Sequence, residues 1–246
     1  MRPQKQTPLT SRKRKLKSIE IVVLIIVFVL MTIGIIAAIV NKSWFEEKYV
    51  VEDGFIEDIT LIPLTVLTIA CLLYLARFTR KKNAWFFLTY LGIALGSFFV
   101  LGEEISWGQR IFHFKTSEFF EEHNSQDEEN IHNLVLDGEK LNKIIFTDAL
   151  IAGVAIYLVG FPWLYGRNDR FKKFMDDSGV PIPALYQIIC SLLVFGLSFL
   201  TFDSKGAELL EFGGCAMFML IVLYPVNGAA RFQPNLSRAG QRKHSP

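Results

Sequence analysis

Six apolar runs, each about as long as a lipid bilayer is thick, constrain this chain more than any other feature. The runs cover about 21–40, 56–78, 84–102, 144–165, 182–202 and 209–230. A transmembrane helix needs about 20 consecutive, mostly apolar residues. Hydrophobic residues make up 51% of the chain, and its mean hydropathy is +0.33, which is high for a soluble domain. We therefore predict an all-α fold, a six-span transmembrane helical bundle over residues 19–230, flanked by a basic tail (1–18) and a C-terminal tail (231–246).

The distribution of Lys and Arg predicts that both termini are cytoplasmic. With that orientation, 19 of the 26 basic residues fall in four cytoplasmic segments, 1–18, 77–82, 167–173 and 231–246. Cytoplasmic segments of membrane proteins carry such an excess of Lys and Arg. In contrast, 20 of the 24 acidic residues fall on the outer side. The formal net charge of only +2 gives no reason to expect a nucleic-acid partner.

Carboxylates recur at the outer ends of four of the predicted spans. They are Glu52, Asp53, Glu57 and Asp58 on the second span, Glu103 and Glu104 on the third, Asp148 about one turn inside the fourth, and Glu208 and Glu211 on the sixth. A charge at membrane depth costs on the order of a few kcal/mol unless it has a partner or water. We therefore predict a water-filled, outward-facing pocket lined by acids and His. Glu103 shares a helix face with Gly92, Gly96 and Phe99, so we expect it to point into the bundle.

The segment between the third and fourth spans, residues 103–143, is predicted to form an outer lid. Within it, Phe residues alternate with Glu and Lys over 111–122, a pattern typical of a helix that lies along a membrane surface. We expect an interfacial helix here, with Thr116 as its N-cap residue. The lid also contains three of the four His residues of the chain, His113, His123 and His132.

Two short motifs in this region carry most of the polar chemistry. The first is GEEISWGQR at 102–110, and the second is N-x-Q-x-E-x-N-x-H-N at 124–133. The predicted catalytic residues are Glu103, Glu104, His132 and Asp148. The predicted substrate-binding residues are Trp107, Gln109, Arg110, Asn124, Gln126, Asn130 and Asn133. Carboxamides both donate and accept hydrogen bonds, so this set suits a polyhydroxylated or phosphorylated head group.

The residue types leave two kinds of chemistry open. One is metal-assisted hydrolysis or transfer, with a divalent metal such as zinc and with ligands drawn from His113, His123, His132 and Glu104. The other is metal-free acid–base catalysis by paired carboxylates or by a carboxylate and His132. No spacing typical of a known nucleophile, phosphate or zinc motif selects between them.

The double motif GEEISWGQR…NxQxExNxHN resembles that of an uncharacterised family of bacterial multi-pass membrane proteins. The resemblance covers chiefly residues 102–133 and implies a bacterial plasma (inner) membrane protein. We expect an enzyme that acts on a lipid or a lipid-linked glycan head group, with membrane lipids as its surroundings. Two alternatives stay open: a transporter or cation-binding carrier, and a non-catalytic membrane assembly protein.

Overall fold

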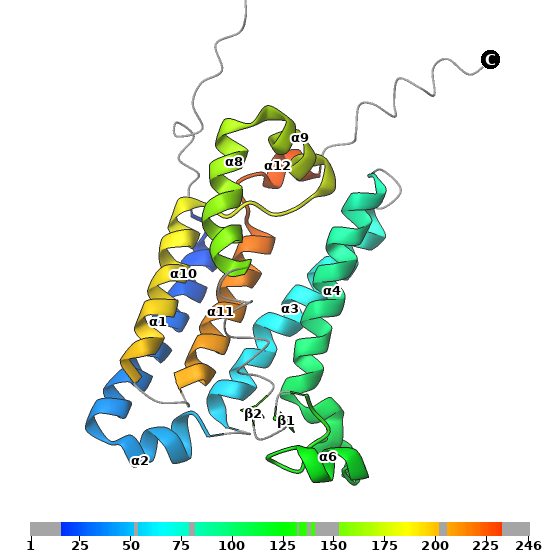
Figure 1. The fold of residues 1–246 in the computed structure, drawn as a ribbon. Helices are drawn as coiled ribbons and strands as arrows, with labels where there is room; N and C mark the ends of the chain where they lie inside the picture. The colour runs from blue at the N-terminus through cyan, green and yellow to red at the C-terminus, as the bar shows by residue number, and fades with distance from the viewer. Residues whose placement is uncertain are drawn as a thin grey trace, which may run out of the picture.

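A computed structural model of the chain describes residues 16–51, 54–78, 82–131, 133–136, 139–140, 153–201 and 206–232. These residues are almost entirely helical (Figure 1). The helices are α1 (Ser18–Val40), α2 (Lys42–Trp44), α3 (Phe55–Phe78), α4 (Ala84–Glu104), α5 (Gln109–Phe112), α6 (Glu118–His123), α8 (Phe161–Arg167), α9 (Asp169–Ser178), α10 (Leu185–Ser198), α11 (Gly206–Leu223) and α12 (Gly228–Arg231). A small antiparallel hairpin pairs β1 (Val135–Leu136) with β2 (Glu139–Lys140).

Four of these helices are long and apolar enough to cross a membrane: α1, α3, α4 and α11. They correspond to the first, second, third and sixth predicted spans. Their long axes run side by side between two ends of the molecule, one carrying α6 and the hairpin, the other carrying α8, α9 and α12 (Figure 1). We call these the α6 end and the α9 end. The α6 end contains the start of α3, the end of α4 and the start of α11, which carry three of the four predicted groups of carboxylates.

The remaining two predicted spans are shorter or lie partly outside the described residues. The fifth is the apolar helix Leu185–Thr201, formed by α10 and a final 3-10 turn. It begins after the extended, proline-containing segment 180–184. Of the fourth, residues 144–152 lie outside the described residues, and the rest is helical, with a π-helical turn at Ile156–Gly160 leading into α8.

The sixth span ends earlier than the apolar run suggests. The prediction extended it to residue 230, but α11 ends at Leu223 and a turn separates it from α12. Pro225 explains the difference, because proline lacks the backbone donor that the next helical turn needs and disfavours a helical conformation at the residue before it.

The core of the bundle lies around α11, which packs against α1, α3 and α10, while α3 also packs against α4. Small residues permit two of these close contacts. A Cβ atom at Gly34 would lie 2.7 Å from Leu209 Cδ1, and one at Gly213 would lie 2.5 Å from Val194 Cγ1. Near the α6 end, the buried Tyr49 donates its hydroxyl to Leu30 O at 2.8 Å. Burial raises the pKa of this hydroxyl to about 12.

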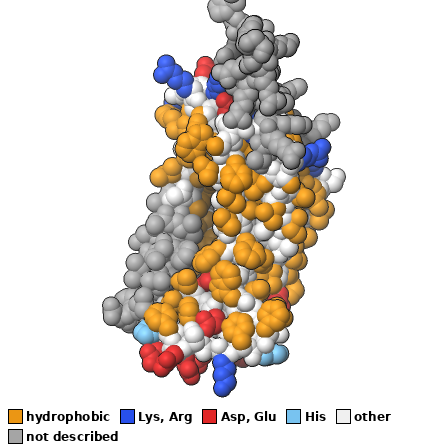
Figure 2. Space-filling model, turned by 90° about the vertical axis from the view of Figure 1, so that its right-hand side faces the viewer, with side chains coloured by type: hydrophobic (Ala, Val, Ile, Leu, Met, Phe, Trp, Pro, Cys, Tyr) orange, Lys and Arg blue, Asp and Glu red, His pale blue; other side chains and the backbone are white. Residues whose placement is uncertain are grey.

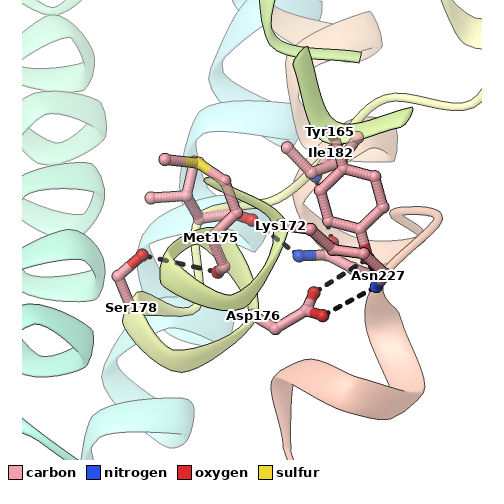
Figure 3. Close-up of polar contacts among 8 residues, drawn as sticks. Tyr165, Lys172, Met175, Asp176, Ser178, Ile182 and Asn227 are labelled. Atoms are coloured by element: carbon pink, nitrogen blue, oxygen red, sulfur yellow. Dashed lines mark hydrogen bonds and ion pairs between the residues drawn. The ribbon is translucent and has the colours of Figure 1, made fainter. Parts of the chain in front are cut away.

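At the α9 end, side-chain hydrogen bonds join α8 to α9 and the segment after α9 to the turn after α11 (Figure 3). Lys172 of α9 donates to the Tyr165 hydroxyl at 2.7 Å and forms an ion pair with Asp176 at 2.9 Å. Asn227 accepts the Ile182 N–H at 3.1 Å and so ties the extended segment 180–184 to the end of α11. Burial lowers the pKa of Lys172, but its bonds to Tyr165 and Asp176 outweigh that effect and leave the pKa raised.

All four Trp residues of the chain are substantially exposed, and they lie at two levels. Trp85 and Trp163 lie toward the α9 end, and Trp44 and Trp107 lie at the α6 end. Exposed Trp residues at two levels are typical of the two interfaces of a membrane. The 21 residues of α4, which almost join the two levels, span about 31 Å at 1.5 Å per residue. That length matches the roughly 30 Å hydrocarbon core of a bilayer.

The charged side chains separate along the same axis. Figure 2 shows one face of the molecule, with hydrophobic side chains over its middle and acidic and His side chains gathered toward the lower end. Most described basic side chains lie at the α9 end: Lys17, Arg77, Lys82, Arg167, Arg170, Lys172 and Lys173. The segregation of acids and bases expected from the sequence is therefore present in the described residues.

Candidate functional site

The first motif folds back on the end of α4 through an unusual turn. Ser106, Trp107 and Gly108 follow one another with φ angles of 44°, 52° and 85°, all in the left-handed region. This turn lays the Trp107 ring over Gly102, where a Cβ atom would lie only 2.9 Å from two ring carbons. Glycine at 102 therefore makes room for the ring, and glycine at 108 adopts a conformation that other residues reach at a cost.

Glu103 connects this turn to the second motif. Its carboxylate accepts the Trp107 indole N–H at 2.7 Å and the backbone N–H of Ile131 at 2.6 Å. The side chain is only 8% exposed. Glu103 thus faces Trp107 and the lid, and its expected orientation into the bundle is wrong. The next residue, Glu104, takes that position.

Three side chains form the second connection between the motifs: the buried Ser106 and Asn130 and the partly buried Glu128. The Ser106 hydroxyl donates to Glu128 at 2.8 Å, and the Asn130 amide donates to both Ser106 (3.0 Å) and Glu128 (2.7 Å). Asn124 in turn donates to Asn130 Oδ1 at 3.0 Å. Ser106 is fully buried, which makes its hydroxyl a structural group and not an accessible nucleophile.

Gln109 makes the third connection. Its amide nitrogen donates to the Thr116 hydroxyl at 2.7 Å, and its carbonyl oxygen accepts the Glu129 N–H at 2.8 Å. The expected N-cap role of Thr116 is wrong, because Ser117 precedes α6 and the Thr116 hydroxyl donates to the backbone oxygen of Asp127 instead. The described part of the lid contains two short helices, α5 and α6, in place of one continuous helix.

The carboxylates of three helices converge on Glu104. Its carboxyl group lies within electrostatic range of Glu208 and Glu211 of α11, of Glu57 of α3 and of its neighbour Glu103. We call Glu57, Glu104, Glu208 and Glu211 the acid cluster. Glu104 and Glu211 are both partly buried, and Glu57 is 9% exposed. The prediction that spans two, three and six bring acids to one place agrees with this arrangement.

The remaining predicted site residues are placed as follows. His113 is exposed beside α5, and His123 stacks on Phe119 within α6. Gln126 is exposed and Asn133 is buried. His132 and Asp148 lie outside the described residues, as does the side chain of Arg110.

Metal binding by these residues stays a prediction. Within the described part of the chain, no three His, Cys, Asp or Glu side chains lie close enough to share a metal ion. In the described residues, the carboxylates of the acid cluster therefore lie farther apart than the ligands of one metal ion. Several partly buried carboxylates near one another can transfer protons or attract a cationic group.

An apolar pocket of about 280 Å³ opens beside Glu103 and the Trp107 ring. Its lining is Phe99, Glu103, Trp107, Phe114, Phe120, Glu129 and Ile131. This pocket and the hydrogen-bonding roles of Ser106, Glu128 and Glu129 are not predicted by the residue pattern. The signal in the sequence is the set of Phe residues in the lid, whose alternation with Glu and Lys predicts only contact with the membrane surface.

Comparison of the chain with models of protein families, with curated proteins and with solved structures gives no match.

Proposed function

We propose that this chain is an enzyme of the bacterial plasma membrane that acts on the polar head group of a lipid or a lipid-linked glycan. The observation that carries the proposal is the convergence of the acid cluster on Glu104 at the α6 end. Paired carboxylates in a partly buried place can act as general acid and general base. In this proposal Glu104 transfers the proton, and His132 and Asp148 are its predicted partners.

The distribution of charge supports an orientation in which the α6 end faces outward and both termini are cytoplasmic. Basic side chains gather at the α9 end, as the cytoplasmic side of a membrane protein requires. In this proposal the helices at 153–167 and 185–201 complete a six-span bundle. Leu185–Thr201 has 17 residues, which is the lower limit for a span.

The described interior below the acid cluster favours an enzyme over a carrier. Between α3, α4 and α11, the described buried cluster on the side away from the acids contains Leu67, Cys71, Phe86, Tyr90 and Val222, and the buried polar Ser97 beside it is already bonded to Thr68 at 2.8 Å. A carrier needs polar groups along its path through the membrane. The acids at one end and the apolar core behind them instead suit a site that is reached from one side.

The motif contacts explain how such a site would keep its shape. The Glu103, Ser106 and Gln109 side chains each bond to the second motif, more than 17 residues away along the chain. These bonds fix the lid next to Glu104. Substrate contact by Trp107, Asn124 or Asn130 would therefore come in addition to a structural role.

The test uses proteoliposomes made from a bacterial polar lipid extract, with lipid species followed by mass spectrometry. We expect the wild-type protein to change the amount of at least one species, and Glu104→Gln to abolish that change. Glu118→Gln, at an exposed position on α6, is the matched control and should act like the wild type. An unchanged lipid profile with wild-type protein, or full turnover by Glu104→Gln, would refute the proposal.

A further inference from the structure

We infer that the pocket beside Trp107 binds one acyl chain of an amine-bearing, zwitterionic phospholipid. The inference rests on the proposed function for the position of the head group, and it names the class of lipid.

The lining of the pocket selects an apolar occupant. Five of the lining residues are apolar or aromatic: Phe99, Trp107, Phe114, Phe120 and Ile131. Of the two carboxylates, Glu103 already accepts two hydrogen bonds, and Glu129 accepts the Ser117 N–H. A polar ligand would therefore find few groups to bond inside the pocket, whereas a hydrocarbon chain would remove its apolar walls from water.

The pocket is continuous with the membrane-facing surface of α4. The Trp107 ring packs edge-on against Phe98 and Phe99, which are both exposed on this candidate span. Further along the same face, no described atom lies within 4 Å of a Cβ atom built at Gly96 or Gly92. A lipid chain that lies along α4 would thus reach the pocket without crossing a polar barrier.

The size and depth of the pocket agree with a single chain. A volume of about 280 Å³ lies just below the range of about 300–1,000 Å³ of small-molecule pockets, so the pocket would take part of one acyl chain and not a whole lipid. Trp107 lies at the predicted level of the membrane interface, where acyl chains meet their head groups. A chain in the pocket would leave its head group beside Glu103, one residue before Glu104.

The charge at the rim selects the head group. Glu103 and Glu129 line the pocket, and the exposed Glu121 follows Phe120 directly. These carboxylates attract an ammonium group and repel a head group with a net negative charge. An ethanolamine head group therefore suits the rim better than a glycerol head group of the same chain composition.

The test measures lipid retention by the purified full-length protein with native mass spectrometry. The probes are dioleoyl phosphatidylethanolamine and dioleoyl phosphatidylglycerol, each added separately. Ile131→Trp fills the pocket, and Ile111→Trp places the same side chain on an exposed part of the lid outside the pocket. We expect one retained ethanolamine lipid in the wild type and in Ile111→Trp, and about tenfold less in Ile131→Trp, which corresponds to about 1.4 kcal/mol.

A second measurement covers the case in which Ile131→Trp does not fold. With Trp44, Trp85 and Trp163 replaced by Phe, Trp107 is the remaining indole, and its emission should be quenched more by brominated ethanolamine lipid than by brominated glycerol lipid. The inference would be overturned if the two Ile→Trp variants retained equal amounts of lipid, or if the two brominated lipids quenched Trp107 equally. It would also be overturned if cross-linking showed a second copy of the chain on this face in place of lipid. Retention is independent of turnover, so a lipid-binding but inactive protein would refute only the proposed function.

Discussion

Replacement of Glu103 by Gln tests whether one carboxylate joins the two motifs. In the wild type, its two oxygens accept the Trp107 indole N–H and the Ile131 backbone N–H. Gln has nearly the same shape but only one oxygen, and its NH₂ group cannot accept a hydrogen bond. One of the two donors would therefore face another donor, and the bond to Ile131 would weaken.

The expected size follows from the burial of the side chain. A hydrogen bond to a charged group contributes about 1.5–3 kcal/mol, and a buried donor left without a partner costs about 1–3 kcal/mol. Because Glu103 is only 8% exposed, solvent replaces little of the lost bond. We expect the free energy of local opening at Ile131 to fall by about 2 kcal/mol, which is about a 30-fold change in the opening equilibrium.

Hydrogen exchange measured by mass spectrometry reports this opening directly. The Ile131 amide should exchange about 30-fold faster in Glu103→Gln than in the wild type. The matched control is Glu121→Gln, an exposed position on the same lid, which should leave the Ile131 exchange rate unchanged. The reasoning is refuted if Ile131 exchanges at the wild-type rate in Glu103→Gln, or if both variants accelerate it equally.

Three further changes test other parts of the structure. Gly108→Ala places a side chain at φ 85° and 3.0 Å from Phe112, so the melting temperature should fall by the equivalent of about 1–2 kcal/mol; an unchanged melting temperature would contradict the turn. Asn227→Ala removes the acceptor of the Ile182 N–H and should cost about 1–3 kcal/mol in SDS unfolding, without any change in lipid retention. Burial raises the pKa of Tyr49 from its ordinary value of 10.0 to about 12, so the contribution of this hydroxyl to stability is complete below pH 10 and is lost as the pH rises through 12. The difference between the absorbance titrations of the wild type and of Tyr49→Phe should show a tyrosine that ionises near pH 12, and a difference that appears near pH 10 would contradict the prediction.

The sequence predicted the long helices and the acid cluster because both depend on local patterns. Uninterrupted apolar length is enough to identify α1, α3, α4 and α11 as candidate spans. The acids then follow from the ends of those spans. The predicted span extended past the end of α11 at Leu223, although Pro225 marks that end, because Val226, Ala229 and Ala230 continue the apolar residues beyond the proline.

The interlocked motifs could not be predicted from spacing. Ser106 and Trp107 adopt positive φ angles that residues other than glycine rarely adopt, so the sequence gives no clear sign that the chain turns back there. Glu103 does share a helix face with Gly92 and Gly96, but no described atom lies within 4 Å of a Cβ atom at either glycine, so this face of α4 does not pack against a described helix as the small residues suggested. The bond from Glu103 to Ile131 joins residues 28 apart in a chain segment that has no regular periodicity.

The spacing between the two levels of Trp residues sets the bilayer thickness that the helices match best. Trp85 and Trp107 lie near the two ends of α4, so the distance between them fits a hydrocarbon layer of about 30 Å. In a thicker or thinner bilayer the helices must tilt, or the lipids must stretch or compress around them. Either response shifts Glu104 relative to the lipid phosphates, so the reactivity of the acid cluster should depend on the chain length of the surrounding lipids as well as on their head groups.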